Sequence, residues 1–140
     1  MGFVKFKIKP KGVTHYFVVF VFDTKKEMHD FKHEYDKIEG VTDGYGGFGA
    51  IVMPYTIENT KTGKIKNEIG TCLFYRDFIG AGPISHEMLH CAMWYERLLH
   101  GNKDACFGQN VGEDEERLCY TMTDLIRSFV NKMYKLGYYG

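Results

Sequence analysis

The residues best suited to chemistry in this chain are His86, Glu87 and His90, which stand in the order His-Glu-Met-Leu-His. Histidines four residues apart lie one turn apart on the same face of a helix, close enough to share one metal ion. Glu87 points about 100° away from His86, so it is poorly placed as another ligand of that ion. It can instead take a proton from a water molecule on the open side of the metal. The pattern therefore predicts a metal-dependent hydrolase with Glu87 as general base.

A helix must hold these residues in register, and the flanking sequence predicts one. Residues 80–83, Gly-Ala-Gly-Pro, are typical of a turn that leads into a helix. Residues 84–100 contain no glycine or proline and are apolar on nearly every side, so we expect a buried helix. Buried polar groups require partners, and a shared metal would satisfy both histidines. In the alternative, each histidine is a core residue bonded to a carbonyl, which does not account for the glutamate between them.

A catalytic zinc usually takes three protein ligands and leaves a fourth position to water. Glu96 lies ten residues after His86, but on a continuous helix it points about 280° away from it, so we reject Glu96. His100 faces the same side as His86 but lies roughly 21 Å along the axis. The remaining candidates are the acidic residues 113–116, which open the last predicted helix.

Within this acidic run, Glu115 is the best candidate for the third ligand. The last helix is expected to have one apolar face, comprising Leu118, Cys119, Met122, Leu125, Ile126, Phe129, Val130 and Met133. Glu115 projects near the middle of that face, where a carboxylate is costly unless it is paired or bound to metal. Glu116 lies beyond the edge of the face and stays an alternative. Acids in a first turn can also simply complement the helix dipole, which suffices for Glu113 and Asp114.

The layout resembles the gluzincin branch of the zincin metallopeptidases, with HExxH on one helix and a glutamate ligand on a following helix. The resemblance implies that His86, His90 and Glu115 bind zinc (Zn2+) and that Glu87 is the general base of peptide hydrolysis. It covers roughly residues 65–130. Small ImmA/IrrE-like and minimal SprT-like proteins have similar plans, and small HExxH proteins occur in phages.

The resemblance also suggests residues that would assist the reaction. Gluzincins often place an aspartate four residues after the ligand glutamate, where this chain has Cys119. A tyrosine or arginine usually stabilises the oxyanion, and Tyr120 and Arg97 are the candidates.

In zincins a strand near the active-site helix borders the cleft and pairs with extended substrate. By analogy, we expect Thr71, Leu73 and Tyr75 to bind substrate by addition of a strand. The alternative is that residues 71–75 form an interior strand.

Hydrophobic periodicity predicts an α+β fold: a small, mainly antiparallel sheet with one packed helix, the active-site helix and a C-terminal helix. Thr24-x-x-Glu27 is a capping box that opens the first helix. Pro54 places its strand at a sheet edge or puts a bulge in it. We expect one zincin-like domain over residues 1–140. Its strands are predicted at residues 3–9 and 16–22 and in a hairpin of residues 48–58 and 64–78.

Composition limits the partners. Lys plus Arg and Asp plus Glu both total 18, so no net charge attracts nucleic acid or an anionic membrane. The longest apolar run, residues 16–22, is too short to span a bilayer. The four cysteines form no CxxC pair, which favours free thiols in the cytoplasm, or in the host cytoplasm if the protein is viral. The expected partner is a protein or peptide substrate, and the sequence does not give the oligomeric state.

Other interpretations remain open. The chain is alternatively a non-catalytic zinc-binding interaction module, such as a regulatory or phage protein, or a hydrolase of a non-peptide amide. The motif can also arise by chance. A second pair four residues apart, His29 and His33, lies opposite the apolar stripe of its helix and is interpreted as surface polar residues. The glycine-rich residues 40–49 lack the ending of a phosphate loop and are expected to form a connection.

Overall fold

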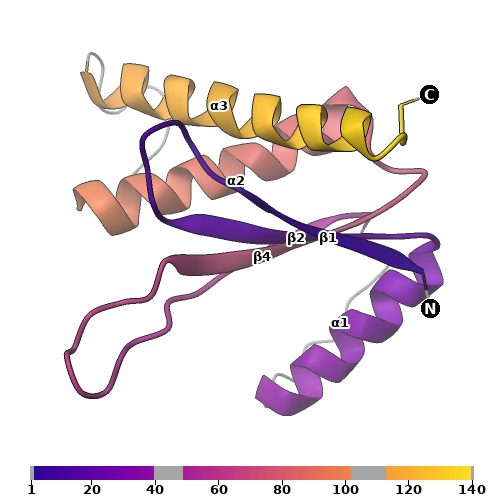
Figure 1. Ribbon diagram of the computed structural model, residues 1–140, viewed down its shortest axis with the longest axis horizontal. Coiled ribbons are helices and arrows are strands. Elements are labelled where there is room, and N and C mark those ends of the chain that lie inside the picture. The colour runs from indigo at the N-terminus through magenta and orange to yellow at the C-terminus, as the bar shows by residue number, and fades with distance from the viewer. Residues whose placement is uncertain (1, 40–48, 102–112, 140) are drawn as a thin grey trace.

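The computed structural model describes residues 2–39, 49–101 and 113–139 (Figure 1). Its elements, in chain order, are β1 (Phe3–Ile8), β2 (Tyr16–Phe22), α1 (Lys25–Glu39), β3 (Ile51–Pro54), β4 (Glu68–Tyr75), α2 (Ala81–His100) and α3 (Glu113–Lys135). This order of strands and helices confirms the predicted α+β fold. Residues 40–48 of the glycine-rich connection, Phe48 at the start of the predicted hairpin, and Cys106 lie outside the described residues.

The four strands form one sheet in the order β1-β2-β4-β3. Strands β1 and β2 pair antiparallel, and the antiparallel pairing of β3 with β4 confirms the predicted hairpin. The central pair, β2 with β4, is parallel, which the sequence did not predict. A parallel pair needs a long connection between its strands, and α1 and β3 lie in that connection here.

Of the signals at the ends of elements, the capping box before α1 forms only in part. The backbone N–H of Glu27 donates to Thr24 Oγ1 at 3.2 Å, which is one half of the predicted capping box. The Glu27 carboxylate does not close the other half, because it accepts from the Thr24 hydroxyl and from the backbone of Gly2. Gly63 adopts a φ of +71° in the hairpin turn, a conformation that favours glycine.

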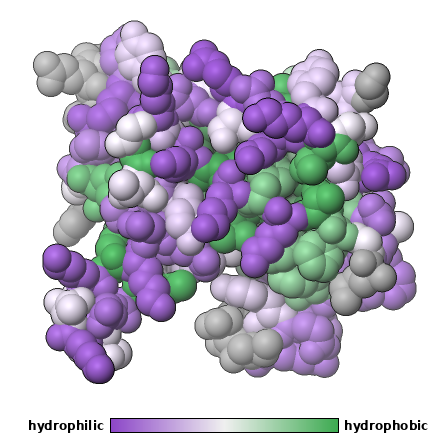
Figure 2. All heavy atoms as spheres, in the orientation of Figure 1, coloured by the Kyte–Doolittle hydropathy of each residue, from purple (hydrophilic) through white to green (hydrophobic). Residues whose placement is uncertain are grey.

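The helices lie on opposite faces of the sheet, with α1 on one face and α2 and α3 on the other (Figure 1). Because both faces are covered, the central strands β2 and β4 are apolar on both sides. On the face shown in Figure 2, hydrophilic residues predominate and apolar residues appear between them. None of the helices in the described ranges is long and apolar enough to cross a membrane.

Helix α2 is fixed against the sheet by specific contacts as well as by apolar packing. Trp94 Nε1 donates to the carbonyl of Ile69 at 2.9 Å, and the Tyr95 hydroxyl donates to the carbonyl of His15 at 2.7 Å. Nearer its start, Cys91 Sγ lies 3.6 Å from Cys72 Sγ, and both are free, buried thiols. These contacts determine which side of α2 remains open to solvent.

Candidate metal centre

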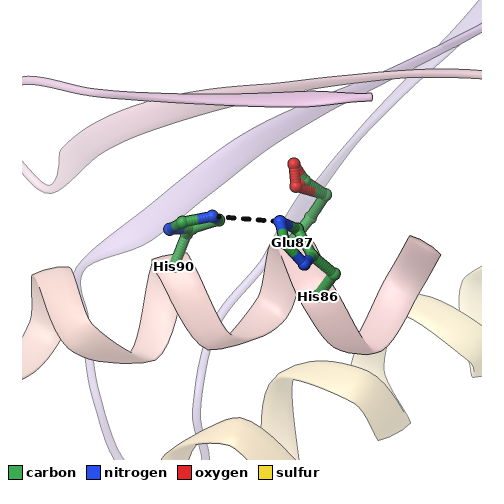
Figure 3. Close-up of side chains that lie close together, drawn as sticks. All are labelled: His86, Glu87 and His90. Atoms are coloured by element: carbon green, nitrogen blue, oxygen red, sulfur yellow. Dashed lines mark hydrogen bonds between the residues drawn. The ribbon is translucent and has the colours of Figure 1, made fainter. Parts of the chain in front are cut away.

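His86, Glu87 and His90 gather on the side of α2 that faces away from α3 (Figure 3). One ligand atom from each lies within 4.8 Å of the others, and His86 Nε2 lies 3.3 Å from His90 Nε2. Two imidazole nitrogens at about 2.05 Å from one tetrahedral zinc ion would be about 3.3 Å apart. The two rings therefore already have the spacing that a shared tetrahedral zinc requires. The same distance also fits a long hydrogen bond between the two rings. The surroundings of Glu87 help to distinguish a metal site from a simple hydrogen bond.

Glu87 is only 6% exposed, although both histidines are exposed. Its Oε2 is buried and has no hydrogen-bond partner among the described residues. Burial raises the pKa of the Glu87 carboxyl, while His86 and His90 act in the opposite direction. A buried carboxylate without a donor is costly, and a purely structural role gives no reason to keep one. A role as proton acceptor in a reaction would explain why the chain keeps a buried carboxylate despite its cost in free energy.

Two pockets meet at Glu87. The larger, of about 490 Å³, is called the apolar pocket here, and its lining comprises Gly49, Ala50, Phe78, Gly82, Pro83, His86 and Glu87. The smaller, of about 200 Å³, is called the arginine pocket, and its lining comprises Ile51, Val52, Pro54, Glu87, His90, Met93, Trp94 and Arg97. The cluster therefore lies between two cavities, which share Glu87 in their lining.

The histidines are more exposed than the sequence predicted. The apolar composition of residues 84–100 indicated a helix buried all round, yet His86, His90 and Arg97 are exposed. The sheet and α3 bury two sides of α2 in one core, and these three residues lie outside that core. Exposure gives a ligand or substrate access to the cluster.

Glu115 does not join the cluster, so the prediction that it is the third ligand is wrong. The group that the described residues form contains only His86, Glu87 and His90, and it includes neither Glu115 nor Glu116. Helix α3 packs on the other side of α2 (Figure 3), where Arg117 binds Glu96. The projection of α3 gave its inward face but not the side of α2 that this face meets.

The rejection of Glu96 as a ligand agrees with the structure. Glu96 is 1% exposed, and both of its carboxylate oxygens accept from Arg117, at 2.7 and 2.8 Å. This pair joins α2 to α3. The sequence offered no signal for it, because the two residues are 21 apart and each lies on a different helix.

The prediction that Thr71, Leu73 and Tyr75 bind substrate by addition of a strand is also wrong, and the alternative of an interior strand is confirmed. Residues 71–73 of β4 pair with both β2 and β3, so an extended peptide cannot add to them. Leu73 is fully buried, the Thr71 hydroxyl lies 2.7 Å from the Tyr55 hydroxyl, and Tyr75 stacks on Phe78. The edge strand beside the cluster is β3, whose edge position Pro54 predicted.

Of the two residues considered for the oxyanion, Arg97 lines a pocket with His90 and Glu87. Tyr120 is 68% exposed on α3 and lines neither pocket. The sequence analysis missed Trp94 and Phe78 as pocket residues. Trp94 follows Glu87 by seven residues and so shares its side of the helix, a spacing that could have identified it.

Comparisons with known proteins give no relative. No protein-family model, no curated protein and no solved structure matches this chain.

Proposed function

We propose that this protein is a zinc-dependent peptidase of the zincin type, with its reaction centre on α2. The observation that carries the proposal is the 3.3 Å spacing of two imidazole nitrogens beside Glu87, whose buried Oε2 has no hydrogen-bond partner among the described residues. An HExxH helix requires these features if two residues are to hold a metal and the third is to move a proton. The pockets on both sides of Glu87 give a peptide chain room to pass through the centre.

His86 and His90 would hold the metal through their Nε2 atoms, and imidazole is a ligand that suits zinc. A divalent ion bound there would supply Lewis-acid activation of water and of the substrate carbonyl. The described residues offer two imidazoles, and Glu87 is the nearest carboxylate. Because His86 and His90 are exposed, further ligand positions would be accessible to water or substrate.

Glu87 would perform the proton transfers. Its carboxylate would accept a proton from the attacking water and return it to the nitrogen of the leaving amine. Burial raises the pKa of this carboxyl, which makes it a stronger base than an exposed glutamate. The mostly apolar walls of the adjoining pocket would limit competition from bulk water.

The substrate would be an extended peptide that adds to the free edge of β3. Among the strands that the structure describes, this one pairs with β4 alone, and its residues Ile51, Val52 and Pro54 line the arginine pocket. Main-chain hydrogen bonds of this kind give affinity for an extended chain of any sequence. The apolar pocket, with Phe78 in its wall, would accept a large apolar side chain next to the bond that is cut. The free thiols of Cys72 and Cys91 favour a reducing compartment for this activity.

A peptide-library digest tests this function. We expect zinc-loaded protein to cut extended peptides next to a large apolar residue, with the products identified by mass spectrometry. A chelator should stop cleavage, and added zinc should restore it. Cleavage that continues at full rate in chelator, or an intact library after incubation with zinc-loaded protein, would exclude the proposal.

A further inference from the structure

Arg97 differs from the other arginines of this chain. Arg76, Arg117 and Arg127 each lie within 4.0 Å of a carboxylate, those of Asp23, Glu96 and Asp124 respectively. Arg97 is exposed and forms no such pair with any described residue. It lines the arginine pocket, and Glu87 is the only acid among the described residues of that lining. An arginine that meets no carboxylate among the described residues, and lies in a cavity beside the proposed reaction centre, is suited to bind an anionic ligand.

The position of Arg97 on α2 determines where such a ligand would lie. Arg97 follows His90 by seven residues, so it points in nearly the same direction and lies about 10.5 Å farther along the axis. Helical side chains lean toward the N-terminus, which brings the guanidinium group back toward His90. An extended peptide advances about 3.3 Å per residue. The anionic group would therefore belong to a residue two or three positions from the bond that is cut.

We propose that Arg97 is a specificity residue that binds an acidic side chain of the substrate, two or three residues from the cleaved bond. This inference rests on the proposed peptidase function. The planar guanidinium group can donate two parallel hydrogen bonds to a carboxylate. Pro54, Met93 and Trp94 line the same pocket, and their apolar surface lowers the local dielectric and strengthens the ion pair.

The direction of β3 determines on which side of the cleaved bond the acid lies. Ala50, just before β3, lines the apolar pocket with His86, whereas Pro54 at its end lines the arginine pocket with Arg97. Strand β3 and helix α2 therefore run in the same direction past the centre. An antiparallel peptide, the slightly more stable pairing, would present its N-terminal part to Arg97. The acid is then an aspartate or glutamate side chain before the cleaved bond, and not the carboxylate of a C-terminus.

The test compares two peptides that differ only by glutamate or glutamine at one position, placed in turn two and three residues before the cleaved bond. Wild-type protein should cut the glutamate peptide with a kcat/KM about 10- to 100-fold higher, mostly through KM. Arg97→Gln should bring this ratio close to one. The matched control, Arg127→Gln, removes the same charge from the surface of α3 and should keep the wild-type ratio. If Arg97→Gln lowers kcat equally for both peptides, it stabilises the oxyanion and the inference is overturned.

Binding to the Glu87→Gln protein separates this inference from the function on which it rests. Labelled glutamate and glutamine peptides are titrated with Glu87→Gln and with Glu87→Gln/Arg97→Gln, and fluorescence anisotropy is measured. A preference for the glutamate peptide that disappears with Arg97 supports the inference even if no peptide is ever cut. If the protein cleaves efficiently and the kcat/KM ratio of the two peptides is the same with and without Arg97, the peptidase function stands and the role of Arg97 is refuted. Equal affinity for both peptides in the Glu87→Gln protein would refute it as well.

A role in the helix dipole makes a different prediction. Arg97 lies in the last turn of α2, where a cation is favoured. If that were its whole role, Arg97→Gln would lower the midpoint of thermal unfolding and leave the glutamate preference unchanged, which would overturn the inference.

Discussion

Replacing Glu87 with glutamine should lower the rate of peptide hydrolysis by about 10²- to 10⁴-fold, the usual contribution of a general base. Glutamine has nearly the same shape and preserves the packing between the two pockets, but it cannot accept the proton. The metal content should stay at the wild-type level, because His86 and His90 supply the nitrogens that hold the ion. Rate and zinc content are measured on the same preparations, by peptide cleavage and elemental analysis.

The stability of this variant provides an independent check. Glu87 Oε2 is buried and has no partner among the described residues, so the carboxylate contributes nothing evident to folding. Metal-free Glu87→Gln should therefore unfold at the same denaturant concentration as wild type, or at a higher one. Glu116→Gln, which removes an exposed acid from α3, is the charge-matched control and should keep full activity.

Two results would contradict the role of Glu87. Loss of zinc from Glu87→Gln would mean that the carboxylate is a ligand and not a base. If neither wild type nor Glu87→Gln cleaves any peptide and both bind zinc equally, the non-catalytic interaction module is favoured. Such a module binds metal without needing a proton acceptor.

Replacing Arg117 with alanine should lower the free energy of unfolding by about 3 kcal/mol. The change leaves the Glu96 carboxylate, which is 1% exposed, between α2 and α3 without its two charged donors. Isolated buried charges are the costly case, whereas surface ion pairs contribute about 1 kcal/mol or less. We expect a loss at the low end of the range for broken buried ion pairs, because the Arg117 side chain is 35% exposed. Urea unfolding followed by circular dichroism measures it.

A double replacement controls for the other contacts of Arg117. Glu96→Met with Arg117→Met removes both charges and should recover most of the stability that Arg117→Ala loses. Arg127→Ala, which breaks a more exposed pair with Asp124, should cost less than about 1 kcal/mol. A loss in Arg117→Ala no larger than in Arg127→Ala would show that the buried pair does not hold α2 against α3.

The sequence predicted what depends on local spacing. Alternation predicted β1 to within one residue, and a run of β-branched and aromatic residues predicted β2. Thr24 predicted the start of α1, and the edge position of β3 is one of the two alternatives that Pro54 left open. The helical spacing of His86 and His90 also predicted that their side chains meet. These signals depend on backbone geometry within a few residues, which sequence alone determines well.

The errors concern how elements pack together. Glu115 was assigned from its position on the apolar face of α3. That face packs against α2, but on the side opposite His86. The parallel pairing of β2 with β4 makes β4 an interior strand, and among the described strands the one at that edge of the sheet is β3. Orientation between elements comes from the whole core and from pairs such as Glu96 and Arg117, which have no local periodicity.

The central claim is that His86 and His90 hold one metal ion, and zinc titration of the metal-free protein by calorimetry tests it most directly. We predict one zinc per chain, and an affinity more than about 100-fold weaker in His86→Ala and in His90→Ala, since loss of a ligand exceeds the effect of losing a residue that only orients one. The matched control is His29→Ala/His33→Ala, which removes the other histidine pair four residues apart and should bind zinc as wild type does. Undiminished zinc binding by His86→Ala/His90→Ala, or no zinc binding by the wild-type protein, would contradict the claim.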